Sequence, residues 1–220
     1  MRLVATCVVG NLPWAHKSVA SMREYASKVG ADFHEVKWFP DKDKVYNGNL
    51  YYVLVSMLKR LREQDYYTEV LALDCDTLIM KDCPNLFEMS GDLLCAQDQP
   101  WPVKDARYLA WLGRNFPTSS ECAIAADAKL PYFNSGVLLF RVEALRRMNL
   151  DGPYPDDYPP DQDYLNMRVG EAALNVTWLT NHFNQRHLGD RTWAVRYNHI
   201  LHFIGPQKND LIEFANFLHV

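Results

Sequence analysis

The sequence predicts an α/β protein with a central, mostly parallel sheet and helices on both faces. Short apolar runs, typical of buried strands, alternate along the chain with longer segments in which apolar residues recur at helical spacing. Strands that alternate with helices favour a mostly parallel sheet. The length of 220 residues suits one domain, which we expect to span residues 1–220.

The first elements are a strand, a helix and a second strand. Residues 2–9 (RLVATCVV) form an apolar run that predicts a buried strand. Residues 15–29 carry apolar side chains at helical spacing and are followed by Gly30, a residue that favours helix ends. Residues 32–39 alternate in a way that is typical of a strand.

The middle of the chain continues this alternation. Residues 50–64 (LYYVLVSMLKRLREQ) predict a helix with a basic and polar outer face, and residues 69–74 (EVLALD) predict the third strand. Residues 92–98 (DLLCAQD) predict a fourth strand. The segment 99–132 contains Pro and Trp residues without a clear period, and we expect a loop-rich insertion or lid there.

The next segment places a strand at 136–140 and a short helix at 142–149. Residues 151–160 (DGPYPDDYPP) predict a Pro-rich loop, which a helix over 161–170 follows from an Asp cap.

The C-terminal part adds strands at 174–179 and 199–204. It closes with a helix over 209–220 that Asn209 or Asp210 is expected to cap.

Composition and charge exclude several classes of function. The chain is 48% hydrophobic and 23% charged, which is ordinary for a globular protein, and its net charge of −4 does not favour a nucleic-acid partner. It has no apolar run long enough to cross a membrane and no signal-peptide pattern, so we expect a cytoplasmic protein. The five cysteines form no CxxC pair, which favours buried free thiols over a zinc site or a disulfide framework.

Two carboxylates leave the predicted strand 69–74 one residue apart. Asp74 and Asp76 lie at its carboxyl end, where ligands bind in sheets of this kind. Side chains of like charge repel, and a divalent cation held between two hard oxygen ligands removes that repulsion. The alternative is that both residues only cap a turn, which is a common role of Asp.

Three later segments also carry polar residues at element ends, namely YFNSGVLLF (132–140), PPDQDYLN (159–166) and LHFIGPQK (201–208). The glycine of the first permits close approach of a ligand to the backbone. Each segment also has an ordinary structural interpretation: a β-bulge at the glycine, a helix cap at the first Asp, and a structural histidine.

In this order and spacing the segments resemble one family. The chain is similar to glycosyltransferases of the GT-A fold, in particular to the retaining enzymes of glycosyltransferase family 8. The resemblance spans nearly the whole chain, and the segments that carry it are the N-terminal strand, LALDCDTLI, CAQD, YFNSGVLLF, DQDYLN, FNQR (183–186) and HFIGPQK.

The resemblance implies a fold and an activity. The GT-A fold is a Rossmann-like nucleotide-diphospho-sugar transferase fold. The expected enzyme is a hexosyltransferase of glycan biosynthesis. It moves a sugar from a nucleotide-diphosphate sugar, expected to be a UDP-sugar, to a hydroxyl of a glycan or other acceptor with retention of configuration.

The resemblance also assigns a metal site. Asp74 and Asp76 match the DxD pair of the family, and with His202 they are expected to bind Mn²⁺ or Mg²⁺. We expect His202 to leave another strand of the same sheet, and the imidazole to favour Mn²⁺. Removal of a repelling charge by Asp76→Ala is expected to raise the melting temperature of the metal-free protein.

The remaining roles concern the donor. Asp161 and Gln162 match the pair at the donor sugar near its anomeric carbon, and these are the predicted catalytic residues. Gly205 and Lys208 match residues that contact the donor diphosphate. Other expected donor-binding or sugar-binding residues are Thr6, Cys7, Val8, Asp74, Cys75, Asp98, Asn134, Ser135 and Gly136.

The sequence departs from the family pattern at three places. The first strand ends without the acid that pairs with uracil in the family, although uridine is still the expected base. The helix at 50–64 has no match to the basic residue of a Tyr-x-Arg setting. Asn209 and Asp210 stand where Pro-Trp is usual, and no basic, aromatic tail follows, which argues against an acceptor embedded in a membrane.

Two other functions stay open at this point. A catalytically silent nucleotide-sugar-binding protein would share the fold, although an intact Asp74, Asp76 and His202 speak against it. A haloacid dehalogenase-type phosphatase also has a DxD after a strand. That class places the pair near the N-terminus before Gly-Thr, whereas Thr77 directly follows Asp76 here.

Overall fold

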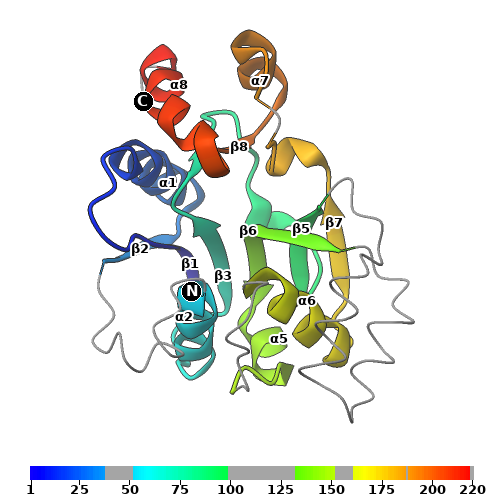
Figure 1. Cartoon of the computed structure of the whole chain (residues 1–220). Helices are drawn as coiled ribbons and strands as arrows, with labels where there is room; N and C mark the ends of the chain where they lie inside the picture. Colours follow the sequence, from blue (N-terminus) through cyan, green and yellow to red (C-terminus); the bar gives the residue numbers. More distant parts are fainter. Residues whose placement is uncertain (38–51, 99–131, 152–160, 187, 219–220) are drawn as a thin grey trace.

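The computed structural model describes residues 1–37, 52–98, 132–151, 161–186 and 188–218. Its main sheet has six strands in the order β2-β1-β3-β6-β5-β7 (Figure 1). The strands are β1 (Arg2–Cys7), β2 (Asp32–Val36), β3 (Glu69–Asp74), β5 (Leu93–Gln97), β6 (Phe133–Arg141) and β7 (Val176–Leu179).

The sheet is mostly parallel, as the sequence predicts. Strand β1 pairs in parallel with β2 and β3, and β5 pairs in parallel with β7. Strand β6 is the exception, because it runs antiparallel between β3 and β5. The carboxyl end of β3 therefore lies beside the start of β6, which brings the DxD segment next to the FNSG segment.

Helices cover both faces of the sheet, as expected. Alternate residues of a strand point to opposite faces, so Leu3 and Ala5 of β1 pack in one core cluster and Val4 packs in another. The first cluster includes α2 (Val53–Arg62), α5 (Val142–Arg147) and α6 (Asp161–Glu171), and the second includes α1 (Ala15–Val29). Figure 1 shows α1 on the opposite side of the sheet from the other three helices.

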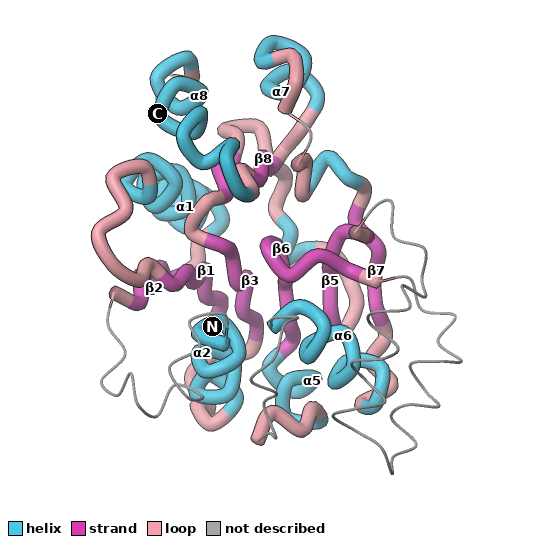
Figure 2. The backbone as a smooth tube through the Cα atoms, in the orientation of Figure 1, coloured by secondary structure: helices cyan, strands magenta, loops and turns pink. Residues whose placement is uncertain are grey.

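A second, small sheet lies beyond the end of β3. Strands β4 (Thr77–Ile79) and β8 (Ile200–His202) pair antiparallel, with Thr77 opposite His202. Helices α7 (Arg191–Tyr197) and α8 (Leu211–Phe217) pack on this sheet in a third core cluster. Both stand beyond β8, at the end of the molecule away from the N-terminus (Figure 2). The expectation that His202 leaves a strand of the main sheet is therefore wrong.

Most predicted elements are confirmed within a few residues. Helix α1 has the predicted bounds and ends at Gly30, whose φ of 66° is the left-handed conformation that glycine favours. The predicted cap of the last helix is wrong, because α8 continues from a 3-10 helix (Gly205–Asp210) and the Asp210 side chain makes no capping hydrogen bond. Strand β4, helix α7 and the short 3-10 helices Leu86–Glu88 and Asn181–Phe183 were not predicted.

Two predicted loops cannot be compared with the structure, since 99–131 and 152–160 lie outside the described residues. In the part of the chain that is described, no helix is both long and apolar enough to cross a membrane. The four cysteines in that part are free thiols, in line with the expectation from their spacing.

Candidate active site

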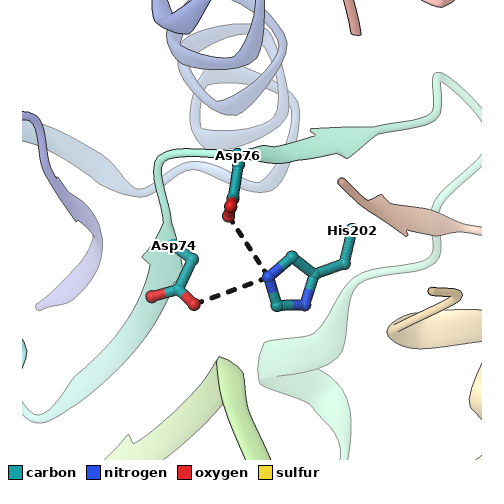
Figure 3. A group of neighbouring side chains, drawn as sticks. All are labelled: Asp74, Asp76 and His202. Carbon is teal, nitrogen blue, oxygen red and sulfur yellow. Dashed lines mark ion pairs between the residues drawn. The ribbon is translucent and has the colours of Figure 1, made fainter. Parts of the chain in front are cut away.

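Three side chains converge where the main sheet meets the small sheet. Asp74 ends β3, Asp76 follows two residues later, and His202 ends β8. His202 Nε2 lies 3.2 Å from Asp76 Oδ1 and 3.5 Å from Asp74 Oδ2 (Figure 3). One ligand atom from each residue lies within 4.8 Å of the others. The pairing of β4 with β8 thus brings a C-terminal imidazole onto the carboxylate pair.

Backbone contacts hold the carboxylate-bearing turn in place. The Thr77 hydroxyl donates to the Asp74 carbonyl oxygen at 2.9 Å, which closes the turn between β3 and β4. The Phe203 N–H donates to the Asp76 carbonyl oxygen at 2.9 Å, which ties the turn to the end of β8. Neither contact uses a carboxylate oxygen of Asp74 or Asp76.

The two carboxylates have different electrostatic surroundings. Burial and the Asp76 charge raise the pKa of Asp74 to about 6, although 37% of the Asp74 side chain is exposed. Burial alone would also raise the pKa of Asp76, but His202 and Lys208 outweigh it and lower that pKa. The repulsion between the two carboxylates therefore raises the pKa of Asp74, whereas Asp76 is stabilised as an anion.

Lys208 is the cation that the protein itself supplies to this site. Its Nζ lies 2.8 Å from Asp76 Oδ2 and 5.6 Å from the centre of the Trp14 ring. Burial alone would lower the pKa of Lys208, but the hydrogen bond to Asp76 raises it overall. The side chain is 39% exposed, so its charge is also accessible to an anionic ligand.

The three converging residues fit a divalent cation. Apart from the His202 Nε2 at 3.2 Å, the buried Oδ1 of Asp76 has no hydrogen-bond partner among the described residues, which leaves a charged oxygen to be satisfied. Two carboxylates and one imidazole nitrogen are ligands that suit Mn²⁺, and Mg²⁺ accepts the carboxylate oxygens. Asp74, Asp76 and His202 are the residues that would hold such an ion.

The structure explains why position 136 is a glycine. A Cβ atom at Gly136 would overlap His202 Cε1 and would lie 2.6 Å from His202 Nδ1. The glycine therefore makes room for the imidazole. It also lies in β6 where the pairing with β5 shifts register, between the partners of Cys95 and Gln97. Approach of a ligand to this backbone, as the sequence suggests, stays a prediction.

The predicted catalytic amide is held from both ends. The Gln162 oxygen Oε1 accepts from Asn134 Nδ2 at 2.8 Å and from the Ser135 N–H at 3.1 Å. Its nitrogen Nε2 donates to Asp98 Oδ2 at 3.0 Å, and Asp98 forms an ion pair with Arg186. Four residues that the sequence singles out are thus joined in one network.

A cleft of about 330 Å³ opens beside these groups. Asp74, Asp76, Asp161 and Lys208 give it a polar lining, and apolar residues from the end of β1 and the start of α2 line the rest. Burial and the Asp74 charge raise the pKa of Asp161, so its neutral form is favoured more than in an ordinary Asp. The cleft thus combines charged groups with apolar surface, as sites for organic phosphates require.

The predicted donor-binding residues fall into two groups around this cleft. Those that line it are Cys7, Asp74, Cys75, Ser135, Asp161 and Lys208. Asp98, Asn134, Gly136 and Gln162 instead make contacts in the network that adjoins His202.

Three other predicted residues are in different surroundings. Thr6 is fully buried within the sheet, and the Val8 N–H donates to the Val36 carbonyl oxygen. Gly205, with a φ of 57°, opens the 3-10 helix that carries Lys208.

The two cysteines of the cleft are poor candidates for chemistry. Burial, with nearby acidic groups, raises the pKa of both Cys7 and Cys75 to about 12. Both thiols therefore stay protonated at neutral pH, and a thiol is a weaker nucleophile and metal ligand than a thiolate.

Two further polar residues belong to the site without a predicted role. Asn184 Oδ1 lies 2.9 Å from His202 Nδ1, and Arg186 pairs with Asp98. The sequence does carry a signal for them, because FNQR (183–186) is one of the segments that resemble the family. No role follows from an Asn and an Arg in a loop until their partners are known.

The mostly parallel sheet, with a DxD pair at a strand end and an imidazole brought onto it, defines a glycosyltransferase of the GT-A fold. A family model, Glycosyl transferase family 8, matches residues 9–209, and the chain belongs to this family. It is therefore an enzyme of the glycosyltransferase class. The phosphatase alternative is excluded by this membership.

Solved structures with the same fold agree with this assignment. One is a glycosyltransferase involved in the glycosylation of the major capsid of PBCV-1, with a TM-score of 0.67, 14% identity and coverage of 98% of both chains. Another is the galactosyltransferase LgtC in complex with donor and acceptor sugar analogs (TM-score 0.54, 15% identity, 100% of this chain and 97% of that chain).

A third is mouse xyloside xylosyltransferase 1 (TM-score 0.51, 16% identity, 92% of this chain and 97% of that chain). At such identities the likeness shows the fold alone. A sequence search of curated proteins gives no match.

The unequal surroundings of the two carboxylates predict opposite effects of neutralising them. In EDTA, Asp76→Asn should lower the free energy of unfolding by about 1–3 kcal/mol, because the hydrogen bond between Lys208 and the buried Asp76 loses its negative partner. Asp74→Asn should raise the melting temperature, because it removes the repelled charge. Thermal denaturation at neutral pH measures both.

From the sequence, stabilisation is expected when Asp76 is neutralised. The surroundings of the two carboxylates in the structure instead predict it when Asp74 is neutralised. A shift of both variants in the same direction would contradict this division of roles. Asp82→Asn, at an exposed position outside the site, is the control for the loss of one negative charge.

Proposed function

We propose that the protein transfers a sugar from a UDP-sugar to a hydroxyl group of a glycan or glycoconjugate, with retention of configuration. The observation that carries this proposal is the convergence of Asp74, Asp76 and His202 beside Lys208 in one cleft. The cytoplasmic location expected from the sequence stays a prediction.

The ligand set supports a metal-dependent reaction. Asp74, Asp76 and His202 would hold Mn²⁺ or Mg²⁺ through two carboxylates and one imidazole nitrogen. Such an ion supplies positive charge that stabilises the leaving nucleoside diphosphate. The imidazole favours Mn²⁺ because nitrogen ligands suit that ion better than Mg²⁺.

Lys208 adds a second positive charge for the same leaving group. Its ammonium is held by Asp76 and faces the Trp14 ring, yet more than a third of the Lys208 side chain is exposed, and the residue lines the cleft. A preorganised cation of this kind stabilises charge that develops in the transition state. We therefore assign Lys208 and the neighbouring Gly205 to the donor diphosphate.

Gln162 and Asp161 are suited to the donor sugar in different ways. Both hydrogen bonds accepted by Gln162 Oε1 come from the protein, so this oxygen is held and is poorly placed to act as a nucleophile. The raised pKa of Asp161 also makes it a poor nucleophile and favours a carboxyl that donates to a sugar hydroxyl. Both residues would then orient the sugar rather than bond to it.

This assignment favours a front-face displacement. The acceptor oxygen bonds to the anomeric carbon as the bond to the diphosphate breaks, and the bonding electrons leave with the diphosphate. The hydroxyl proton passes to a leaving phosphate oxygen, so no separate general base is needed. Attack on the face from which the diphosphate leaves retains the configuration.

The donor is the first point to test. We expect a UDP-sugar with Mn²⁺ to raise the melting temperature more than a GDP- or dTDP-sugar does, because binding to the folded state stabilises it. We also expect slow release of UDP that EDTA suppresses. Asp76→Ala should lose the Mn²⁺-dependent stabilisation and the UDP release, whereas Asp82→Ala should keep both.

Two results would overturn the proposal in different ways. If Asp76→Ala binds the donor as tightly as the parent does, the proposed metal site is wrong. Tight, metal-dependent binding without UDP release or sugar transfer to any hydroxyl acceptor would favour the catalytically silent sugar-binding protein. The anomeric configuration of the product, read by proton NMR, tests retention.

The role of Gln162 predicts a separation of turnover from binding. Gln162→Ala should lower kcat by about 100-fold, as loss of one oriented polar group at a reacting centre does, with little change in donor affinity. Gln64→Ala, at an exposed glutamine outside the site, is the matched control. Unchanged turnover with weaker donor binding would reduce Gln162 to a sugar-binding role.

A further inference from the structure

The amide groups next to the metal site have only one orientation that satisfies their partners. The Ser135 N–H points at Gln162 at 3.1 Å, and the Gly136 N–H points at Asn134 at 3.0 Å. A backbone N–H can only donate, so the side-chain atom that it meets must be the amide oxygen. These two contacts fix which end of each amide is which, without reference to any other side chain.

The far end of the network agrees with this orientation. Asp98 is paired with Arg186, so it is an ionised carboxylate that can only accept. It must therefore meet the nitrogen of Gln162, which lies 3.0 Å from Asp98 Oδ2. Asp98 therefore accepts from the nitrogen of the Gln162 amide, and the Ser135 N–H donates to its oxygen.

The orientation of the Asn134 amide in turn fixes that of the Asn184 amide. Because Asn134 Oδ1 accepts from Gly136, its Nδ2 is left to donate to Gln162 Oε1 at 2.8 Å. The same oxygen of Asn134 also accepts from Asn184 Nδ2 at 2.9 Å. The amide of Asn184 is therefore turned with its oxygen toward His202.

The last contact decides where the imidazole carries its proton. Asn184 Oδ1 lies 2.9 Å from His202 Nδ1, and an amide oxygen can only accept, so Nδ1 must carry hydrogen. In the neutral ring Nε2 then has its lone pair free, and Nε2 is the atom that faces Asp74 and Asp76. A histidine that binds a metal through Nε2 needs this tautomer.

Burial makes this control effective. Asn184 is 4% exposed and His202 is 2% exposed, so solvent offers neither group an alternative partner. Loss of a partner in such a place leaves a polar group unsatisfied. The contact also joins the predicted metal ligand to Gln162 through Asn134.

We propose that Asn184 is a positioning residue that fixes the His202 proton on Nδ1 and so presents the Nε2 lone pair to the metal. The inference rests on the proposed function, because the metal site is part of that function. It adds that the metal ligand and the amide at the donor sugar are oriented by one hydrogen-bond network, which ends on Asp98.

The chain contains a matched pair that serves as a control. Asn198 is 1% exposed, and its Oδ1 lies 3.0 Å from His182 Nδ1, while its Nδ2 donates to the Ala194 carbonyl oxygen. It is a second Asn–His pair with a buried Asn, although His182 itself is exposed, and it lies at the C-terminal end of α7, outside the three metal-site residues. Asn198→Ala should therefore disturb stability without changing metal affinity.

The first test reads the tautomer in the metal-free protein. Nitrogen–proton correlation NMR of ¹⁵N-histidine-labelled protein, at a pH above the ordinary histidine range, should show His202 protonated on Nδ1 in the parent. His202→Gln assigns the signal. In Asn184→Ala the His202 signal should move toward a mixture of tautomers, whereas in Asn198→Ala it should not.

The second test reads Mn²⁺ affinity by EPR titration, without donor or turnover. Asn184→Ala should bind Mn²⁺ about 10–100-fold more weakly, as is typical when a contact behind a metal ligand is lost. Asn184→Asp should keep Mn²⁺ affinity, because one carboxylate oxygen still accepts from Nδ1. Its other oxygen would face Asn134 Oδ1, so kcat should fall while the metal stays bound.

Several outcomes would overturn the inference. Protonation of His202 on Nε2 in place of Nδ1 in the parent would do so, as would parent-like Mn²⁺ affinity in Asn184→Ala. Equal losses of affinity in Asn184→Ala and Asn198→Ala would show a general loss of stability instead. If the parent binds no Mn²⁺, the proposed metal site fails, and the tautomer measurement still decides whether Asn184 controls His202.

Discussion

The repulsion between Asp74 and Asp76 is the constraint on which the rest of the site depends. Two carboxylates that leave one strand end together need positive charge near them, and the chain supplies it from its C-terminal part. Lys208 contacts Asp76 directly, and His202 reaches both carboxylates. Lys208 and His202 stabilise Asp76 but leave Asp74 with a raised pKa, so the repulsion is only partly relieved.

The fold is arranged to bring Lys208 and His202 to the carboxylates. Strand β8 pairs with β4 immediately after the DxD turn, and α7 and α8 bury the small sheet that results. Gly136 in β6 leaves room for the imidazole, which explains a glycine at a buried position of a strand. The C-terminal segment therefore completes the site through packing. Changes in the third core cluster should act on the metal ligand as well as on stability.

Much of this could be predicted from the sequence, and the reasons for the remainder are physical. The spacing of the apolar residues and the length of each run were enough to predict α1 and β3, because each element buries apolar residues of its own segment. The antiparallel direction of β6 was not predictable, because a run such as GVLLF is equally apolar in either direction. The small sheet was missed because β4 has only three residues and needs β8 as its partner. The DxD pair and His202 were found from motifs, whereas the part played by Asn184 depends on contacts across 18 residues that no local pattern reveals.

The central claim is that Asp74, Asp76 and His202 form one metal site, and nitrogen coordination tests it most directly. Electron–nuclear double resonance of bound Mn²⁺ in ¹⁵N-histidine-labelled protein, with UDP present, reports any histidine nitrogen bonded to the ion. The account predicts a single ¹⁵N coupling in the parent that is absent in His202→Ala and present in His182→Ala. The absence of ¹⁵N coupling in the parent, or its survival in His202→Ala, would contradict the account.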